Sequence, residues 1–158
     1  MTEATHSITV RRLIPAGRTR VFEAYSRPDV LVQWFTPHPE VSLEVLDFQF
    51  VPEGRFRLRF TMPDGTQKLV GGSYELIAPP DRLVFSWTWE APDPHAGVAT
   101  RVEIELRDEG AATEVVLTHD RLASEEVGTR HAEGWEGMLV RLETWLLHEP
   151  ATAKTANA

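Results

Sequence analysis

The chain has 158 residues, of which 42% are hydrophobic, and a formal net charge of −8. This length is typical of one domain with one core, and the negative charge argues against binding to nucleic acids or to anionic membranes, which need a basic surface. The chain has no cysteine and no apolar run of membrane-spanning length, and its first residues do not resemble a secretory signal. We therefore expect a cytoplasmic protein without disulfides or cysteine-ligated metals.

The first 40 residues predict one strand followed by two short helices. Residues 6–15 form an apolar, strand-like run, which ends at a proline and a glycine. Residues 18–26 repeat apolar residues at helical spacing, and 27–35 predict a second helix, with Pro28 near its start and Pro37 beyond its end. Two successive short helices leave little room for a parallel strand–helix–strand unit.

From residue 42 the apolar period changes from helical spacing to alternation. Within "RFRLRF", for example, Phe56, Leu58 and Phe60 share one face of a strand. Short turns such as "PDGT" separate the runs, so the strands are expected to be antiparallel neighbours. The expected strands are 42–50, 55–60, 67–77, 83–90, 101–107 and 113–120.

A long amphipathic helix is predicted over 124–148, with Ser124 as its cap. Its apolar residues recur in steps of three and four: Trp135, Met138, Leu139, Leu142, Trp145 and Leu146. Because no other long element can cover the sheet, we predict an α+β fold with about seven antiparallel strands curved around this helix. The domain is expected to span 1–148, with 149–158 as a disordered tail.

Four stretches in order along the chain resemble the family named after the activator of the heat-shock protein ninety ATPase. They are "LVQWFTP" (31–37), "GGSYELIAPPDRLVFSWTW" (71–89), "LTH" (117–119) and "HAEGWEGMLVRL" (131–142). The element order is similar to that of the wider START and birch-pollen-allergen-like superfamily. This resemblance implies a helix-grip fold with a cavity between sheet and helix that often holds an apolar small molecule. The eukaryotic namesakes carry a further N-terminal domain for chaperone binding, for which 158 residues leave no room.

Two glycines interrupt the predicted helix, Gly134 and Gly137, and each costs a helix interior roughly 1 kcal/mol relative to alanine. Glycine lets another backbone or a ligand approach closely. Our hypothesis is that one of them faces the interior and keeps space open beside Trp87 and Trp135. The alternative is tight packing of helix on sheet with no ligand.

Two histidines, His119 and His131, are expected to approach each other across the connection between the last strand and the helix. One interpretation is a polar pair at the mouth of a cavity, which orients a ligand or transfers a proton. The other is a pair of hydrogen-bonded histidines that hold the helix to the sheet. Neither has a second ligand at a recognisable metal-binding spacing, so no metal site and no cofactor are predicted.

We interpret the chain as a small-molecule-binding protein with an apolar cavity. A cyclase-like or hydrolase-like enzyme and a chaperone-associated, stress-response module remain as alternatives, with no catalytic residue assigned. The expected partner is an apolar or aromatic small molecule, a heat-shock ATPase is a second candidate, and the sequence leaves open whether a homodimer forms. The predicted ligand-binding residues are Trp34, Phe35, Phe56, Phe60, Phe85, Trp87, Trp89, His119, His131, Gly134, Trp135 and Met138.

Overall fold

The computed structural model describes residues 6–148. Ten elements follow one another in the predicted order: one strand, two short helices, six strands and one long helix. They are β1 (His6–Ile14), α1 (Arg18–Ser26), α2 (Pro28–Trp34), β2 (Ser42–Phe48), β3 (Arg55–Thr61), β4 (Gln67–Ala78), β5 (Arg82–Trp89), β6 (Thr100–Glu109), β7 (Ala112–Leu122) and α3 (Glu125–His148).

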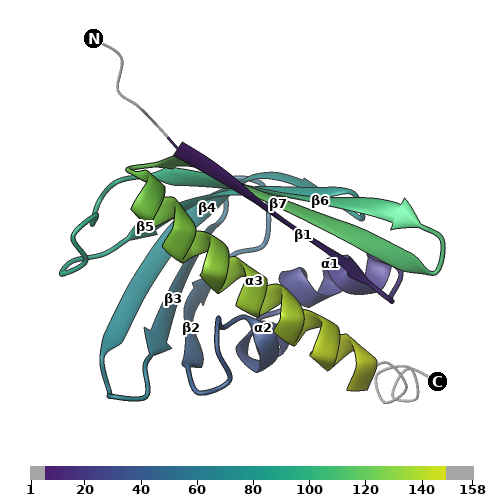
Figure 1. Cartoon of the computed structure of the whole chain (residues 1–158), viewed down its shortest axis with the longest axis horizontal. Coiled ribbons are helices and arrows are strands. Elements are labelled where there is room, and N and C mark those ends of the chain that lie inside the picture. Colours follow the sequence, from purple (N-terminus) through teal and green to yellow (C-terminus); the bar gives the residue numbers. More distant parts are fainter. Residues whose placement is uncertain (1–5, 149–158) are drawn as a thin grey trace, which may run out of the picture.

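The strands form one seven-stranded sheet in the order β1-β7-β6-β5-β4-β3-β2, and every neighbouring pair is antiparallel. Strands β2 to β7 lie beside their neighbours in sequence, and β1 joins the sheet next to β7. The sheet curves around α3, and α1 and α2 lie beside the C-terminal half of that helix (Figure 1). The predicted helix-grip architecture is confirmed.

Helix α3 begins where the capping residue predicts. The Val127 amide donates to Ser124 Oγ at 3.2 Å, and Glu125 and Glu126 occupy the first turn, where the helix dipole favours negative charge. The apolar stripe is buried at Trp135, Met138, Leu139, Leu142 and Leu146. Trp145 is half-buried, and its indole nitrogen donates to Gln33 Oε1 on α2.

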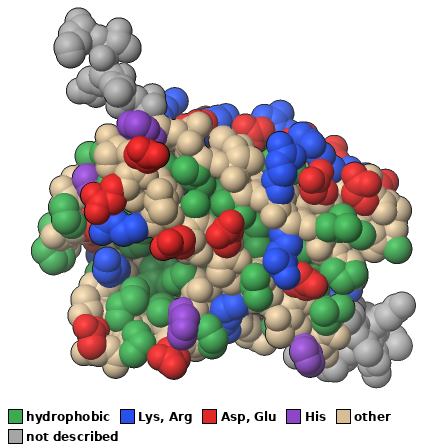
Figure 2. Space-filling view, in the orientation of Figure 1, with side chains coloured by type: hydrophobic (Ala, Val, Ile, Leu, Met, Phe, Trp, Pro, Cys, Tyr) green, Lys and Arg blue, Asp and Glu red, His purple; other side chains and the backbone are tan. Residues whose placement is uncertain are grey.

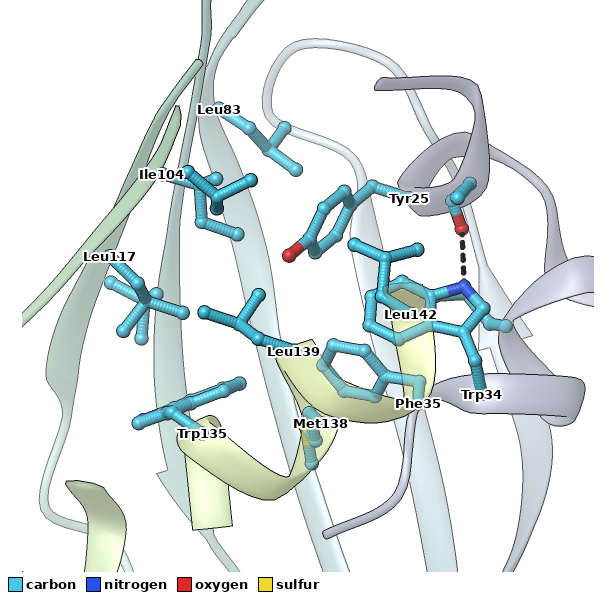
Figure 3. Close-up of a cluster of buried hydrophobic side chains, with 14 of the residues drawn as sticks. Tyr25, Trp34, Phe35, Leu83, Ile104, Leu117, Trp135, Met138, Leu139 and Leu142 are labelled. Atoms are coloured by element: carbon cyan, nitrogen blue, oxygen red, sulfur yellow. Dashed lines mark hydrogen bonds between the residues drawn. The ribbon is translucent and has the colours of Figure 1, made fainter. Parts of the chain in front are cut away.

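The interior beneath α2 and the C-terminal half of α3 is closely packed (Figure 3). Trp34 is only 1% exposed, and its indole nitrogen donates to the Ala24 carbonyl at 3.0 Å. The Tyr25 ring meets Trp34 edge-on, with centroids 4.9 Å apart, a favoured arrangement for aromatic pairs. Leu139 and Leu142 of α3 close this cluster from the helix side (Figure 3).

Strand β7 is longer than predicted. It extends to Leu122, which pairs with His6 of β1, so His119 lies inside the strand between Ile8 and Val102 and not at its end. The predicted tail at 149–158 lies outside the described residues. Within residues 6–148, no helix combines the length and the apolarity needed to cross a membrane.

Candidate ligand pocket

The loop after α2 rests directly on α3. A side chain at Gly137 would overlap the carbonyl oxygen of Pro37, so only glycine lets the two backbones come this close. Beside it, the Arg141 guanidinium donates to the hydroxyl of Thr36 and, at 3.1 Å, to the carbonyl of Gln33. Gly137 therefore marks where the loop that follows α2 reaches the helix.

A pocket of about 700 Å³ opens between the N-terminal half of α3, strands β3 to β5 and the loop between β5 and β6; we call it the mouth pocket. Figure 2 shows it toward the left of the view as a hollow with hydrophobic side chains at its base. Its volume falls within the usual range for small-molecule sites. It is lined by Pro37, Phe60, Met62, Lys68, Trp87, Trp89, Asp93, Pro94, His95, Val127, Arg130, His131, Glu133, Gly134, Trp135 and Met138.

A second space lies deeper between sheet and helices, and we call it the inner cavity. Its volume is about 20 Å³, which is room for about one water molecule. Its walls are apolar and aromatic: Tyr25, Leu31, Phe35, Phe48, Phe56, Leu58, Tyr74, Leu83, Phe85 and Trp87. Of residues 6–148, Trp87 alone lines both spaces.

The structure divides the predicted ligand-binding residues between these places. Seven line the mouth pocket: Phe60, Trp87, Trp89, His131, Gly134, Trp135 and Met138. Three line the inner cavity with Trp87: Phe35, Phe56 and Phe85. Trp34 and His119 line neither space. Trp34 is packed against α1, and His119 is hydrogen-bonded to Trp135, which itself lines the mouth pocket. For all of them, a ligand-binding role stays a prediction.

Sequence reasoning missed the rim of the mouth pocket. Its charged side chains are Lys68 and Arg130, which are cationic, and Asp93 and Glu133, which are acidic. Arg130 and Glu133 flank His131 and Gly134 at helical spacing, which is a signal that could have placed them here. The two signs balance, so these four side chains give the rim no net charge.

His119 is completely buried within a chain of hydrogen bonds. The Trp135 indole donates to its Nδ1 at 3.0 Å, and its Nε2 lies 2.7 Å from the Thr100 hydroxyl, which donates to the Trp87 carbonyl. Because an indole N–H can only donate, Nδ1 must be unprotonated and Nε2 carries the hydrogen. These hydrogen bonds leave no ring nitrogen of His119 free.

His131 is half-buried and has the opposite tautomer. The Trp89 indole donates to its Nε2 at 3.1 Å, so the hydrogen sits on Nδ1, which donates to the Val127 carbonyl at 2.9 Å. The two imidazole rings meet edge-on, with centroids 4.8 Å apart, so the expected approach of the two histidines is observed. Each histidine thus holds one tryptophan of the pocket wall in a fixed orientation.

Burial disfavours a charge on either ring. The pKa of His119 is lowered to about 3, mainly by desolvation and to a smaller extent by the neighbouring His131. Desolvation also lowers the pKa of His131, opposed by its hydrogen bond to Val127. Protonation of either ring would also put an N–H against an indole N–H. Both histidines are therefore neutral at pH 7, which supports a structural role for the pair.

Histidine, aspartate and glutamate side chains do not gather, anywhere in residues 6–148, into a group of three that could hold a metal ion.

The chain was compared with protein families and with curated proteins. The family model described as "Activator of Hsp90 ATPase homolog 1-like protein" matches residues 15–146. No curated protein matches the chain significantly.

Three solved structures illustrate how far the fold is shared. An AHSA1 protein from Silicibacter pomeroyi is 24% identical, with a TM-score of 0.81 over 91% of this chain and 99% of that one. A protein from Chromobacterium violaceum is 19% identical, with a TM-score of 0.79 over 87% and 94% of the two chains. A protein from Mycobacterium smegmatis is 20% identical, with a TM-score of 0.76 over 89% and 90%. At these identities, the similarity shows a common fold.

Proposed function

The chain belongs to the Activator of Hsp90 ATPase homolog 1-like family, and we propose that it binds an apolar, aromatic small molecule in the mouth pocket without transforming it. The observation that carries the proposal is the pocket itself, which measures about 700 Å³, whereas the inner cavity measures only about 20 Å³. Space of this size lined by large apolar side chains is typical of small-molecule sites.

The wall of the pocket favours a flat, aromatic ligand. Three tryptophans line it: Trp87 and Trp89 from β5 and Trp135 from α3. The Trp87 ring lies at 88° to that of Trp89 and at 59° to that of Trp135. Trp87 lies 4.9 Å from Trp135 and 5.6 Å from Trp89, centroid to centroid. Such a cluster suits offset or edge-on contact with a further ring.

Binding without catalysis is the simpler interpretation of the histidines. Acid–base catalysis requires a group that can exchange a proton with the substrate near neutral pH. Both ring nitrogens of His119 and of His131 are engaged in hydrogen bonds, and the pKa of each ring is lowered. Their geometry supports fixing the tryptophans, as described above.

Native mass spectrometry of freshly purified protein tests this proposal, because a retained molecule would appear as an added mass. A titration with a naphthalene-based probe complements it, with Gly134→Leu as the variant that fills the pocket. We expect Gly134→Leu to weaken probe binding by about tenfold or more, the effect of losing one well-packed contact region. The control Val140→Leu places the same side chain at an exposed position of α3 and should leave binding unchanged.

Three outcomes would contradict the proposal. If the wild-type protein neither retains a molecule nor binds the probe, the pocket is not a binding site. Turnover of a retained molecule would indicate an enzyme. Selective capture of a heat-shock ATPase, unaffected by Gly134→Leu, would favour the chaperone-associated role.

A further inference from the structure

The five tryptophans of the chain differ in how their indole N–H groups are used. Four of them donate to an acceptor within the protein: Trp34 to Ala24, Trp89 to His131, Trp135 to His119 and Trp145 to Gln33. The fifth, Trp87, is only 3% exposed, and its buried Nε1 has no hydrogen-bond partner within the described residues.

An unpaired buried donor is costly. Leaving such a group unsatisfied costs roughly 1–3 kcal/mol, and native proteins satisfy most buried polar groups. A phenylalanine at position 87 would fill a similar apolar site without this cost. The N–H of Trp87 therefore calls for an explanation beyond packing.

Its location supplies one. Trp87 alone among residues 6–148 lines both the mouth pocket and the inner cavity, so its ring is the partition between them. The wall of the pocket also includes Met138, whose side chain is flexible and can adapt to a ligand. On the inner side is the small free volume near Tyr25, whose hydroxyl points into the interior (Figure 3). The Trp87 ring thus adjoins free volume on two sides.

We propose that the Trp87 N–H selects, among apolar ligands of the mouth pocket, those that carry an uncharged hydrogen-bond acceptor such as a ketone or ether oxygen. This inference rests on the proposed function. An acceptor that enters the pocket meets Trp87 at its base, and a small rotation of the indole lets the N–H donate to it. An uncharged acceptor fits because the rim charges balance and because a charge buried among these rings would go unpaired.

A matched pair of probes isolates the hydrogen bond. 2-Acetylnaphthalene and 2-ethylnaphthalene share a ring and a similar outline, but only the ketone carries an acceptor. In Trp87→Phe, we expect the ketone to lose about tenfold in affinity relative to the hydrocarbon, which is the worth of about one hydrogen bond. Trp89→Phe is the control: its N–H is engaged by His131, so its loss should change both affinities by the same factor.

A second measurement uses the wild-type protein and does not depend on the folding of a variant. In a ¹H–¹⁵N spectrum each indole N–H gives one resonance, and sequential assignment identifies that of Trp87. We expect the ketone to move this resonance downfield as a hydrogen bond forms, and the hydrocarbon to move it much less.

The outcomes distinguish failure of the proposed function from failure of the inference about Trp87. If neither probe binds the wild-type protein, the proposed function fails and this inference fails with it. If both bind, but Trp87→Phe keeps the ketone preference or the Trp87 resonance responds equally to both, the inference fails while the proposed function stands.

Discussion

The two halves of α3 meet the sheet in different ways. Toward its C-terminus, Leu139, Leu142 and Leu146 pack on a core that leaves about 20 Å³ free. Toward its N-terminus, Gly134 and Trp135 face a pocket of about 700 Å³. Both regions are rich in aromatic side chains, so aromatic content alone does not decide which one is open.

What differs is the element that covers the rings. Over the closed half, α1 and α2 place Tyr25 and Trp34 between sheet and helix, and Trp34 donates to a backbone carbonyl of α1. In the open half, the same role of acceptor falls to the side chains of His119 and His131. In this chain, the two short helices cover the closed part of the interior, and the mouth pocket lies where neither of them contributes a side chain.

Trp34→Ala gives the largest expected effect and tests the closed half. Truncating a fully buried tryptophan should lower the free energy of unfolding by about 3–5 kcal/mol. Urea denaturation measures this, with the half-buried Trp145→Ala as a control that should lose less than about 2 kcal/mol. A loss at Trp34 below that of the control would mean that the core is not closed here.

Gly137→Ala tests the contact that separates the two halves. The added methyl group would overlap the Pro37 carbonyl, so backbone must move, and we expect a loss of roughly 1–3 kcal/mol in the same denaturation experiment. Unchanged or higher stability would show that the loop after α2 does not rest on the helix.

The free energy of unfolding should depend on pH through His119, which lies in the open half. An unfolded histidine takes up a proton near pH 6.5, whereas the folded pKa is about 3, so the unfolded state binds more protons between these values. Stability is therefore full above pH 6.5 and falls as the pH is lowered, by about 2 kcal/mol between pH 7 and pH 5 from this group. Urea denaturation of wild type and His119→Gln at both pH values isolates the contribution, because the variant lacks it. Parallel pH dependence in the two proteins would contradict it.

Gly134→Ala has the smallest expected effect. The added methyl group would meet only the Pro37 Cβ, at an ordinary 3.8 Å, so the helix should gain roughly 0.5–1 kcal/mol from the lower entropy of the unfolded chain. The same variant narrows the mouth pocket and should reduce probe binding. Gly137→Ala is its matched variant. Equal changes in stability at both positions would contradict the difference in packing between Gly134 and Gly137.

Much of this fold could be predicted because its signals are local. Alternation in "RFRLRF", the turn residues and the stripe from Trp135 to Leu146 each follow from periodicity, and Ser124 from its capping chemistry. The approach of His119 to His131 followed from the short connection between β7 and α3.

The candidate site was less accessible to prediction because it depends on contacts between distant segments. All four of Phe35, Phe60, Phe85 and Trp89 are aromatic residues in predicted elements, and the sequence does not distinguish them. Phe60 and Trp89 line the mouth pocket, whereas Phe35 and Phe85 line the inner cavity. Similarly, the pattern of α3 marked Gly137 as unusual but held no information on its partner, Pro37, 100 positions away in the chain.

The clustering of Trp87, Trp89 and Trp135 has an optical consequence. Indole is the main intrinsic fluorophore of proteins, and these three rings lie within 4.9 to 5.6 Å of a neighbour, close enough to exchange excitation energy. Emission from the cluster will respond to any molecule that displaces water from it or quenches one ring. The other two tryptophans, Trp34 and Trp145, do not line the pocket and contribute a background to the emission. Intrinsic tryptophan fluorescence can therefore report whether the pocket is occupied, without a label and before any ligand has been identified.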